Sequence, residues 1–169
     1  LWYPNGTLQH AGILLGIRGV AGHAHKYLPR YRNGYFGRAR LIQSFSAVTA
    51  ACLVIRKEIF TKVGGFNEAL PSSFNDVDFC LRVREAGYRN VYTPYAELYH
   101  HESATRGTDD RPEKQVQFSQ EFEYMKRFWG HVLDHDPAYS PNLSLEHQDF
   151  SLAWPPRVQL LPANYSSSR

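Results

Sequence analysis

The sequence predicts an α/β fold, because strand-like and helix-like segments alternate along its 169 residues. A hairpin signal opens the chain, an apolar run rich in β-branched residues follows, and two later segments have apolar residues at helical spacing. Hydrophobic residues make up 43% of the chain and charged residues 21%, a composition typical of a globular domain rather than a disordered segment. We therefore expect a chain with a hydrophobic core.

Strands are expected in three places. Asn5-Gly6 lies between strand-forming residues and predicts a β-hairpin within residues 1–16, because both residues tolerate the positive φ of a tight turn. Phe45–Arg56 is short, apolar and rich in Val, Ala and Ile, which predicts a central strand buried on both faces. Residues 90–100 alternate like a strand, and Pro94 within them indicates an edge or a bulge.

Helices are expected in three further segments. Residues 57–63 give about two turns that end at Gly64-Gly65. Residues 72–86 begin with cap-type side chains, and Asp78 and Arg82 stand four apart for a surface ion pair. Residues 113–130 predict a late amphipathic helix. Its apolar positions are Phe118, Phe122, Met125, Phe128 and Trp129.

The rest of the chain has no sustained period. Residues 17–40 are rich in Gly, aromatic and basic residues and predict a long loop, whose positive charge suits phosphate, anionic lipid or no ligand. We divide the chain into 1–135 and a Pro- and Ser-rich extended tail, 136–169. Cys52 and Cys80 lie in apolar runs, as buried free thiols of a reducing compartment do. No apolar run reaches the roughly 20 residues that span a bilayer.

Asp76 is the acidic residue whose position best suits a chemical role. It lies in the first turn of the helix expected over 72–86, where the positive end of the helix dipole favours a carboxylate. A carboxylate there can cap the helix, or it can accept a proton from a substrate hydroxyl. A metal-binding Asp76-Val77-Asp78 pair is disfavoured, because the residues before it read as a loop rather than as a buried strand.

Two histidines, His100 and His101, end the last predicted strand. Successive side chains on a strand point to opposite faces, so only one of the two can face a given site. The sequence has no zinc-type spacing of Cys and His. From spacing alone, a surface histidine and a metal ligand both stay open.

The string "VTAACLVIRKEIFTKVGGFNEAL" and the later "FNDVDFCLRVREAGYRNVYTPYAELYHHES" resemble the C-terminal half of family 2 glycosyltransferases of the bacterial surface-polysaccharide type. The resemblance implies a partial GT-A (nucleotide-diphospho-sugar transferase) fold, the C-terminal half of an α/β/α sandwich. In that family an acidic pair opens this helix, and its second member is the base. Asn75-Asp76 stands at those positions, with Asn75 in place of the usual Glu.

The resemblance therefore implies that Asp76 is the catalytic base of an inverting sugar transfer. His100 stands where many relatives have a histidine that completes the shell of Mg²⁺ or Mn²⁺, and His101 is the fallback. Asn75, Asp78, His101 and Arg106 are expected to contact substrate. The implied partners are a nucleotide-sugar donor and a glycan or lipid-linked acceptor. The implied location is the cytoplasm, with peripheral contact at the inner face of the membrane as an option.

Nothing before Phe45 resembles the nucleotide-binding strands or the metal-binding Asp-x-Asp of that family. We therefore expect the missing N-terminal half to be a partner and the fragment to be inactive alone. A non-catalytic sugar-binding or scaffolding domain is the main alternative. A nucleic-acid-binding module using residues 26–40 is the other, although the net charge of +3 is modest and no such fold signature accompanies it.

Overall fold

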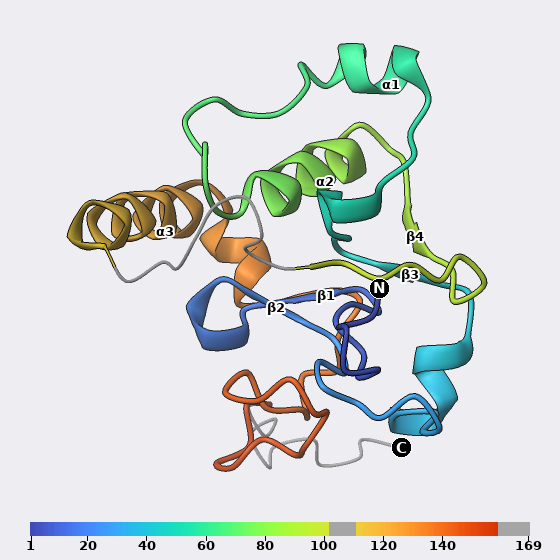
Figure 1. Ribbon diagram of the computed structural model, residues 1–169. Coiled ribbons are helices and arrows are strands. Elements are labelled where there is room, and N and C mark those ends of the chain that lie inside the picture. The colour runs from blue at the N-terminus through green and yellow to red at the C-terminus, as the bar shows by residue number, and fades with distance from the viewer. Residues whose placement is uncertain (102–110, 159–169) are drawn as a thin grey trace, which may run out of the picture.

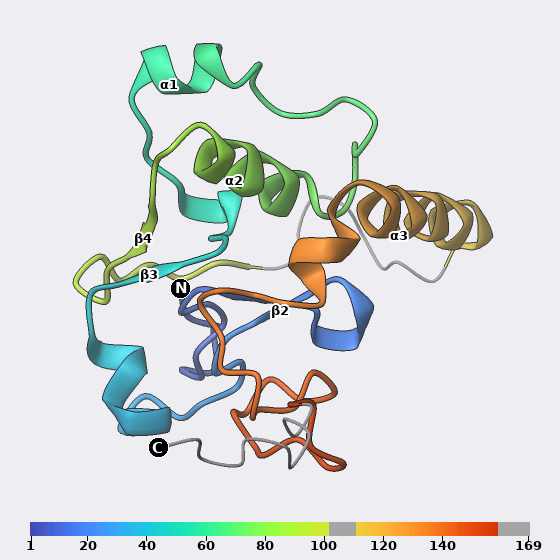
Figure 2. The ribbon, with the colours of Figure 1, turned by 180° about the vertical axis from the view of Figure 1, so that it is seen from behind.

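The computed structural model describes residues 1–101 and 111–158, and this part of the chain has a mixed α/β architecture (Figure 1). Small antiparallel sheets occupy the middle of the molecule. Helices α1 and α2 lie on one side of them, and the irregular segment 136–158 lies on the other, as the view from behind also shows (Figure 2). The predicted α/β class is confirmed at this level.

The two sheets have two strands each. β1 (Ile13–Leu15) pairs antiparallel with β2 (Ala21–His23), and β3 (Gln43–Phe45) pairs antiparallel with β4 (Asn90–Tyr92). The backbone N–H of Ile13 donates to the carbonyl of Ala47 over 3.0 Å. This bond ties the first sheet to the chain that leaves β3, so the two sheets share one core.

β1 is the strand that is buried on both faces. Ile13 and Leu15 enter a cluster with Val77, Cys80 and residues of the last helix. Leu14, between them, enters a second cluster that contains Phe45, Tyr139, Leu143 and Phe150. Alternate residues of a strand point to opposite faces, so these three residues join both halves of the core.

The expected central strand over Phe45–Arg56 is wrong beyond its first residue. Ala50–Cys52 form a 3-10 turn, because the hydroxyl of Thr49 accepts the backbone N–H of Ala51 over 3.3 Å and competes with strand pairing. Val54 is 97% exposed. Cys80 is a buried thiol as expected, whereas Cys52 lies on this exposed turn.

The expected hairpin within residues 1–16 is present in reduced form. Trp2 and Leu8 form a single antiparallel bridge around the turn at Asn5-Gly6, where Gly6 has φ 80°. The expected loop over 17–40 is interrupted by β2 and by 3-10 helices at Ile17–Gly19 and Tyr35–Arg40. After β4, Tyr99 makes only a parallel bridge to Trp2.

The described residues form three α-helices. α1 spans Lys57–Lys62, α2 spans Asn75–Glu85 and α3 spans Pro112–Leu133. Gly64 (φ 81°) and Gly65 (φ 66°) end α1 as predicted. The expected side-chain cap of α2 is wrong, because Phe74 at the N-cap has φ 58° and no side chain bonds the first turn from that position.

The predicted amphipathic helix α3 is confirmed, but its buried face is shifted. Met125, Trp129 and Leu133 are buried, while Phe118 and Phe128 are 47% and 52% exposed. Glu121 is also buried on this face, where its carboxylate accepts the backbone N–H of Ser73 and, over 3.0 Å, the side chain of Gln117. α3 therefore packs against the loop that precedes α2.

Residues 136–158 pack on the second face of β1. The buried carboxylate of Asp136 accepts the backbone N–H of Leu15 over 2.9 Å and that of Ala138 over 2.8 Å, and the hydroxyl of Ser46 donates to it. This part of the expected tail thus contributes to the core. Within 1–101 and 111–158, no helix is both long and apolar enough to cross a membrane.

Candidate functional site

Asp76 is held in the first turn of α2 by two backbone donors. Its Oδ1 accepts the N–H of Val77 over 2.9 Å, and its Oδ2 accepts the N–H of Ala50 over 3.2 Å. The side chain is half-buried, and the helix dipole adds positive potential at this end of α2. Each oxygen keeps a further lone pair, so the carboxylate is fixed in orientation and still able to accept a proton.

Asp78, two residues later, has its oxygens bonded inside the protein. Oδ2 accepts Nε of Arg82 over 2.9 Å, and Oδ1 accepts the indole N–H of Trp129 over 2.9 Å. The residue is only 2% exposed. The expected ion pair with Arg82 is therefore present but buried rather than on the surface, and it joins α2 to α3.

His100 is oriented through Gln9. The Oε1 of Gln9 lies 2.9 Å from Nδ1 of His100, and Nε2 of Gln9 donates to the His100 carbonyl over 3.4 Å. An amide oxygen only accepts, so Nδ1 carries the proton and Nε2 of His100 keeps the lone pair that a metal needs. The neighbouring His101 is exposed.

The 3-10 turn after β3 links Asp76 to a buried histidine. While Ala50 donates to Asp76, the N–H of Thr49 points at Nε2 of His10 over 3.5 Å, and the N–H of Gly12 points at the same atom over 3.3 Å. Nε2 of His10 is thus an acceptor, so its Nδ1 is the donor in the 2.9 Å contact with Nδ1 of His23. His10 thus contacts the segment that donates to Asp76, and the adjacent Gln9 bonds to His100.

Acid is expected to destabilise the fold through His10. Burial, with the charge of His23 as a smaller cause, lowers the pKa of His10 well below 6.5, whereas an unfolded imidazole titrates near 6.5. The unfolded state then binds more protons, so the stability is complete above pH 6.5 and is lost as the pH falls toward the folded-state pKa. One histidine contributes a slope of at most about 1.4 kcal/mol per pH unit.

Burial and Arg38 also lower the pKa of His25 to about 4, which adds to the loss between pH 6.5 and 4. Urea unfolding at pH 7.5, 6 and 5 measures the effect, and His10→Gln should reduce the slope. A free energy of unfolding that stays flat from pH 7.5 to 5 would contradict this account.

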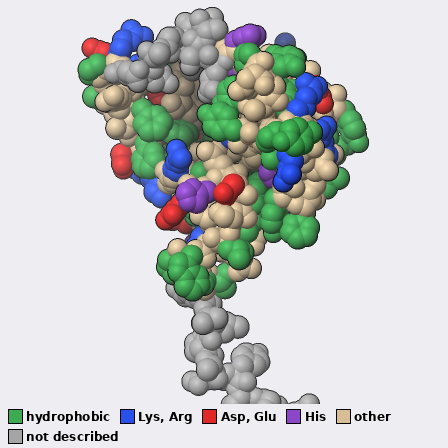
Figure 3. Space-filling view, turned by 60° about the horizontal axis from the view of Figure 1, so that its bottom comes forward, with side chains coloured by type: hydrophobic (Ala, Val, Ile, Leu, Met, Phe, Trp, Pro, Cys, Tyr) green, Lys and Arg blue, Asp and Glu red, His purple; other side chains and the backbone are tan. Residues whose placement is uncertain are grey.

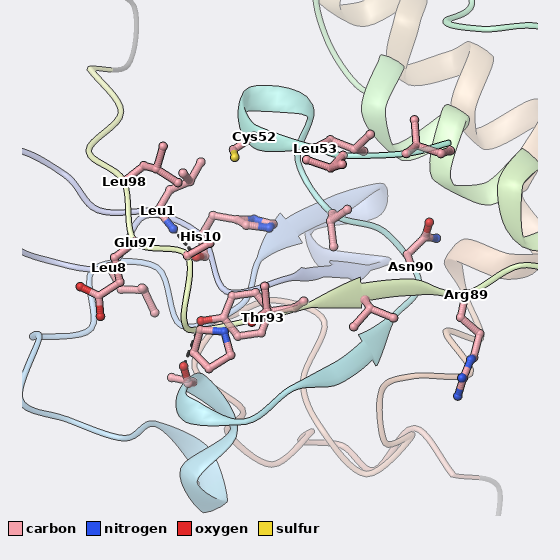
Figure 4. A pocket seen from close by; sticks show the side chains of 18 of the residues that line it. Leu1, Leu8, His10, Cys52, Leu53, Arg89, Asn90, Thr93, Glu97 and Leu98 are labelled. Carbon is pink, nitrogen blue, oxygen red and sulfur yellow. Dashed lines mark hydrogen bonds between the residues drawn. The ribbon is translucent and has the colours of Figure 1, made fainter. Parts of the chain in front are cut away.

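A cavity of about 670 Å³ adjoins this region. Most of its lining residues are apolar, and Figure 4 shows Leu1, Cys52 and Leu98 at one end, with Arg89 and Asn90 at the other. His10 is part of the wall, but Asp76 and His100 are not among the lining residues. This cavity therefore lies beside His10 and does not include the proposed base.

The site residues predicted from the sequence lie in different parts of the structure. Asp76 and Asn75 share the first turn of α2, His100 and His101 follow β4, and Arg106 lies outside the described residues. No group of three His, Cys, Asp or Glu side chains that could hold a metal forms within 1–101 and 111–158. His100 thus fits a metal as a single ligand only.

Sequence reasoning missed Gln9, His10 and Thr49. Each acts across more than 20 residues of chain, and no local pattern marks them. The Asn75-Asp76 position could be found because it follows from a motif, whereas these supports depend on tertiary contacts.

The chain is similar to proteins of several bacteria. It is 58% identical over 156 residues to an uncharacterized protein, y4gI, of Sinorhizobium fredii, covering 92% of this chain and 17% of that protein. It is 37% identical over 153 residues to the O-antigen biosynthesis protein RfbC of Myxococcus xanthus, covering 90% of this chain and 12% of RfbC. Over 62 residues it is 39% identical to the N-acetylglucosaminyl-diphospho-decaprenol L-rhamnosyltransferase of Mycobacterium tuberculosis, covering 37% of this chain and 20% of that enzyme.

The chain spans less than a fifth of the length of the first two relatives. No family model matches it, and no solved structure matches it significantly. The second relative is named for O-antigen biosynthesis and the third for rhamnosyl transfer.

Proposed function

We propose that the chain is the acceptor-side part of an inverting family 2 glycosyltransferase with a GT-A fold, acting in bacterial surface-polysaccharide synthesis. The observation that carries this proposal is the Asp76 carboxylate, fixed at the start of α2 by two N–H donors with lone pairs still free. The similarity to an O-antigen biosynthesis protein and to a rhamnosyltransferase supports the same class.

In the proposed reaction Asp76 takes the proton of an acceptor hydroxyl as that oxygen attacks the anomeric carbon of a nucleotide-linked sugar. The bond between the sugar and the nucleoside diphosphate breaks, and the configuration at the anomeric carbon inverts. The fixed carboxylate aligns the proton transfer. Asn75 and His101 are proposed to contact substrate, whereas Asp78 positions α2 through Arg82 and Trp129.

His100 is proposed to contribute one ligand to Mg²⁺ or Mn²⁺, whose charge would offset that of the leaving diphosphate. Its Nε2 is the available atom, since Nδ1 bonds to Gln9. The remaining ligands would come from outside residues 1–101 and 111–158, as expected for an Asp-x-Asp in the nucleotide-binding half.

The donor is proposed to be a nucleotide-sugar and the acceptor a glycan or a lipid-linked sugar. The mycobacterial relative is named for a diphospho-decaprenol acceptor and for rhamnosyl transfer, and similar chemistry is an option here. We propose a cytoplasmic site of action, with peripheral contact at the inner membrane face.

The class is tested by assaying release of nucleoside diphosphate. We expect sugar transfer from a longer protein that carries these residues together with a nucleotide-binding part, and none from the 169-residue chain alone. Because the nucleotide-binding part is proposed to hold the donor, transfer by the isolated chain would overturn the proposal that this chain supplies only the acceptor side. Tight glycan binding by the longer protein without any transfer would favour the scaffolding alternative.

The role of His100 is tested by the metal dependence of transfer. His100→Gln is expected to raise the Mn²⁺ concentration for half-maximal transfer at least tenfold, because a ligand is lost. Gln9→Leu should raise it about 10- to 100-fold, because the imidazole loses its orienting partner. His101→Gln is the matched control, and a shift with His101→Gln but not with His100→Gln would reverse the assignment.

A further inference from the structure

A second cavity, of about 940 Å³, opens on another part of the surface. Its wall comes from the loop 25–35, from residues 147–149 and from Arg18. None of Asn75, Asp76, His100 and His101 lines it. On the face that Figure 3 turns forward, histidine, basic and acidic side chains lie close together among apolar ones.

Tyr35 and His25 line this cavity, and both stack on Phe150, which is buried and is not among the lining residues. Tyr35 stacks on Phe150, with ring centroids 5.0 Å apart and planes 9° apart, and His25 stacks on Phe150 with centroids 4.3 Å apart. Tyr31 also lines the cavity, is 81% exposed and stacks on no ring among the described residues. Its face is therefore available to the C–H bonds of a ligand ring.

Two buried polar atoms at this cavity have no partner. His25 is only 6% exposed, and neither its Nε2 nor Oε1 of Gln148 makes a hydrogen bond within residues 1–101 and 111–158. Both residues line the cavity. Burial and the charge of Arg38 lower the pKa of His25 to about 4, so the ring is neutral at pH 7. Buried polar atoms are normally paired, so a small rotation of either side chain toward the cavity would let a ligand hydroxyl pair with it.

The charged side chains that line the cavity indicate which polar ligands it favours. Arg18, Lys26 and Arg32 line the cavity, against a single carboxylate, Asp149. A hydrogen bond from Ser151 lowers the pKa of Asp149, so that carboxylate is ionised at pH 7. Three cations against one anion leave a net positive wall, which favours a negatively charged ligand.

We propose that this cavity binds an acidic sugar, a pyranose ring that carries a carboxylate or a phosphate. The ring packs on Tyr31 and the aromatic wall, its hydroxyls pair with His25 and Gln148, and its acidic group faces the basic side chains. This site shares no residue with the proposed transfer chemistry and does not depend on it.

Binding is tested by calorimetric titration of the 169-residue chain with glucuronate, glucose 1-phosphate, glucose and inorganic phosphate. At least one acidic sugar is expected to bind tenfold or more tightly than glucose and than phosphate, and added salt should weaken it. The stronger acidic sugar identifies the acidic group. Equal binding of phosphate and glucose 1-phosphate, with no stronger binding of glucuronate, would overturn the proposal, as would the absence of saturable binding at millimolar concentrations.

Variants locate the site. Tyr31→Ala and Arg18→Gln are expected to weaken binding of the preferred acidic sugar at least fivefold, and Gln148→Met should weaken it without unfolding the chain. Tyr95→Ala is a matched control, because Tyr95 is 80% exposed and lines neither cavity. Arg127→Gln is the matched charge control. Unchanged binding in Tyr31→Ala and Arg18→Gln would sink the proposal and leave the role of Asp76 untouched.

Discussion

Replacing Asp76 by asparagine is expected to lower the turnover number for sugar transfer by about 10²- to 10⁴-fold, the usual contribution of a general base. Asparagine has nearly the same shape, and its amide oxygen can still accept the N–H of Val77 or Ala50. The other N–H loses its acceptor at a half-buried position, which should cost about 1 kcal/mol, so the fold should survive while the proton acceptor is lost. The measurement is kcat in the longer protein, with circular dichroism and thermal unfolding as checks on folding.

The matched control for this experiment is Asp134→Asn. Asp134 is an exposed carboxylate whose side chain meets only Lys126, over 3.5 Å, among the residues described. Its loss should leave kcat unchanged. If Asp76→Asn retained full activity with a normal fold, Asp76 would be a helix-capping acid and the base would have to be sought elsewhere.

Asp78→Ala is expected to have the largest effect on stability, lowering the free energy of unfolding by about 3–5 kcal/mol. The substitution removes the partner of a largely buried Arg82, whose side chain is 24% exposed, and leaves the indole N–H of Trp129 without its acceptor. An uncompensated charge and an orphaned donor both cost free energy in a low-dielectric interior. Urea unfolding of the 169-residue chain measures the loss.

Two further variants separate the causes. Trp129→Phe keeps an aromatic side chain but removes the indole N–H and part of the ring volume, and should cost about 1–3 kcal/mol. Asp134→Ala breaks an exposed pair with Lys126, whose side chains are 60% and 37% exposed, and should cost less than about 1 kcal/mol. If Asp78→Ala were no worse than Asp134→Ala, the bridge between α2 and α3 would not stabilise the fold.

Short sequence patterns correctly predicted the features that depend on interactions between residues close in the chain. The two glycines that end α1, the helix over 75–85 and the i,i+4 pair of Asp78 with Arg82 follow from short-range geometry, and all are present. The apolar run after Phe45 failed as a strand because an apolar composition does not fix the period. There the Thr49 hydroxyl captured a backbone N–H and formed a turn.

The sequence by itself determined the α/β class, the start of α2 at Asn75-Asp76 and the kinds of residue available for chemistry. Tertiary structure alone decided that β1 is buried on both faces, that Asp78 faces Trp129 inside the protein, and that Gln9 orients His100. The physical reason is range. Capping, turns and helical periodicity act over a few residues, whereas burial and hydrogen-bond partners depend on segments such as residues 9 and 100, which only folding brings together.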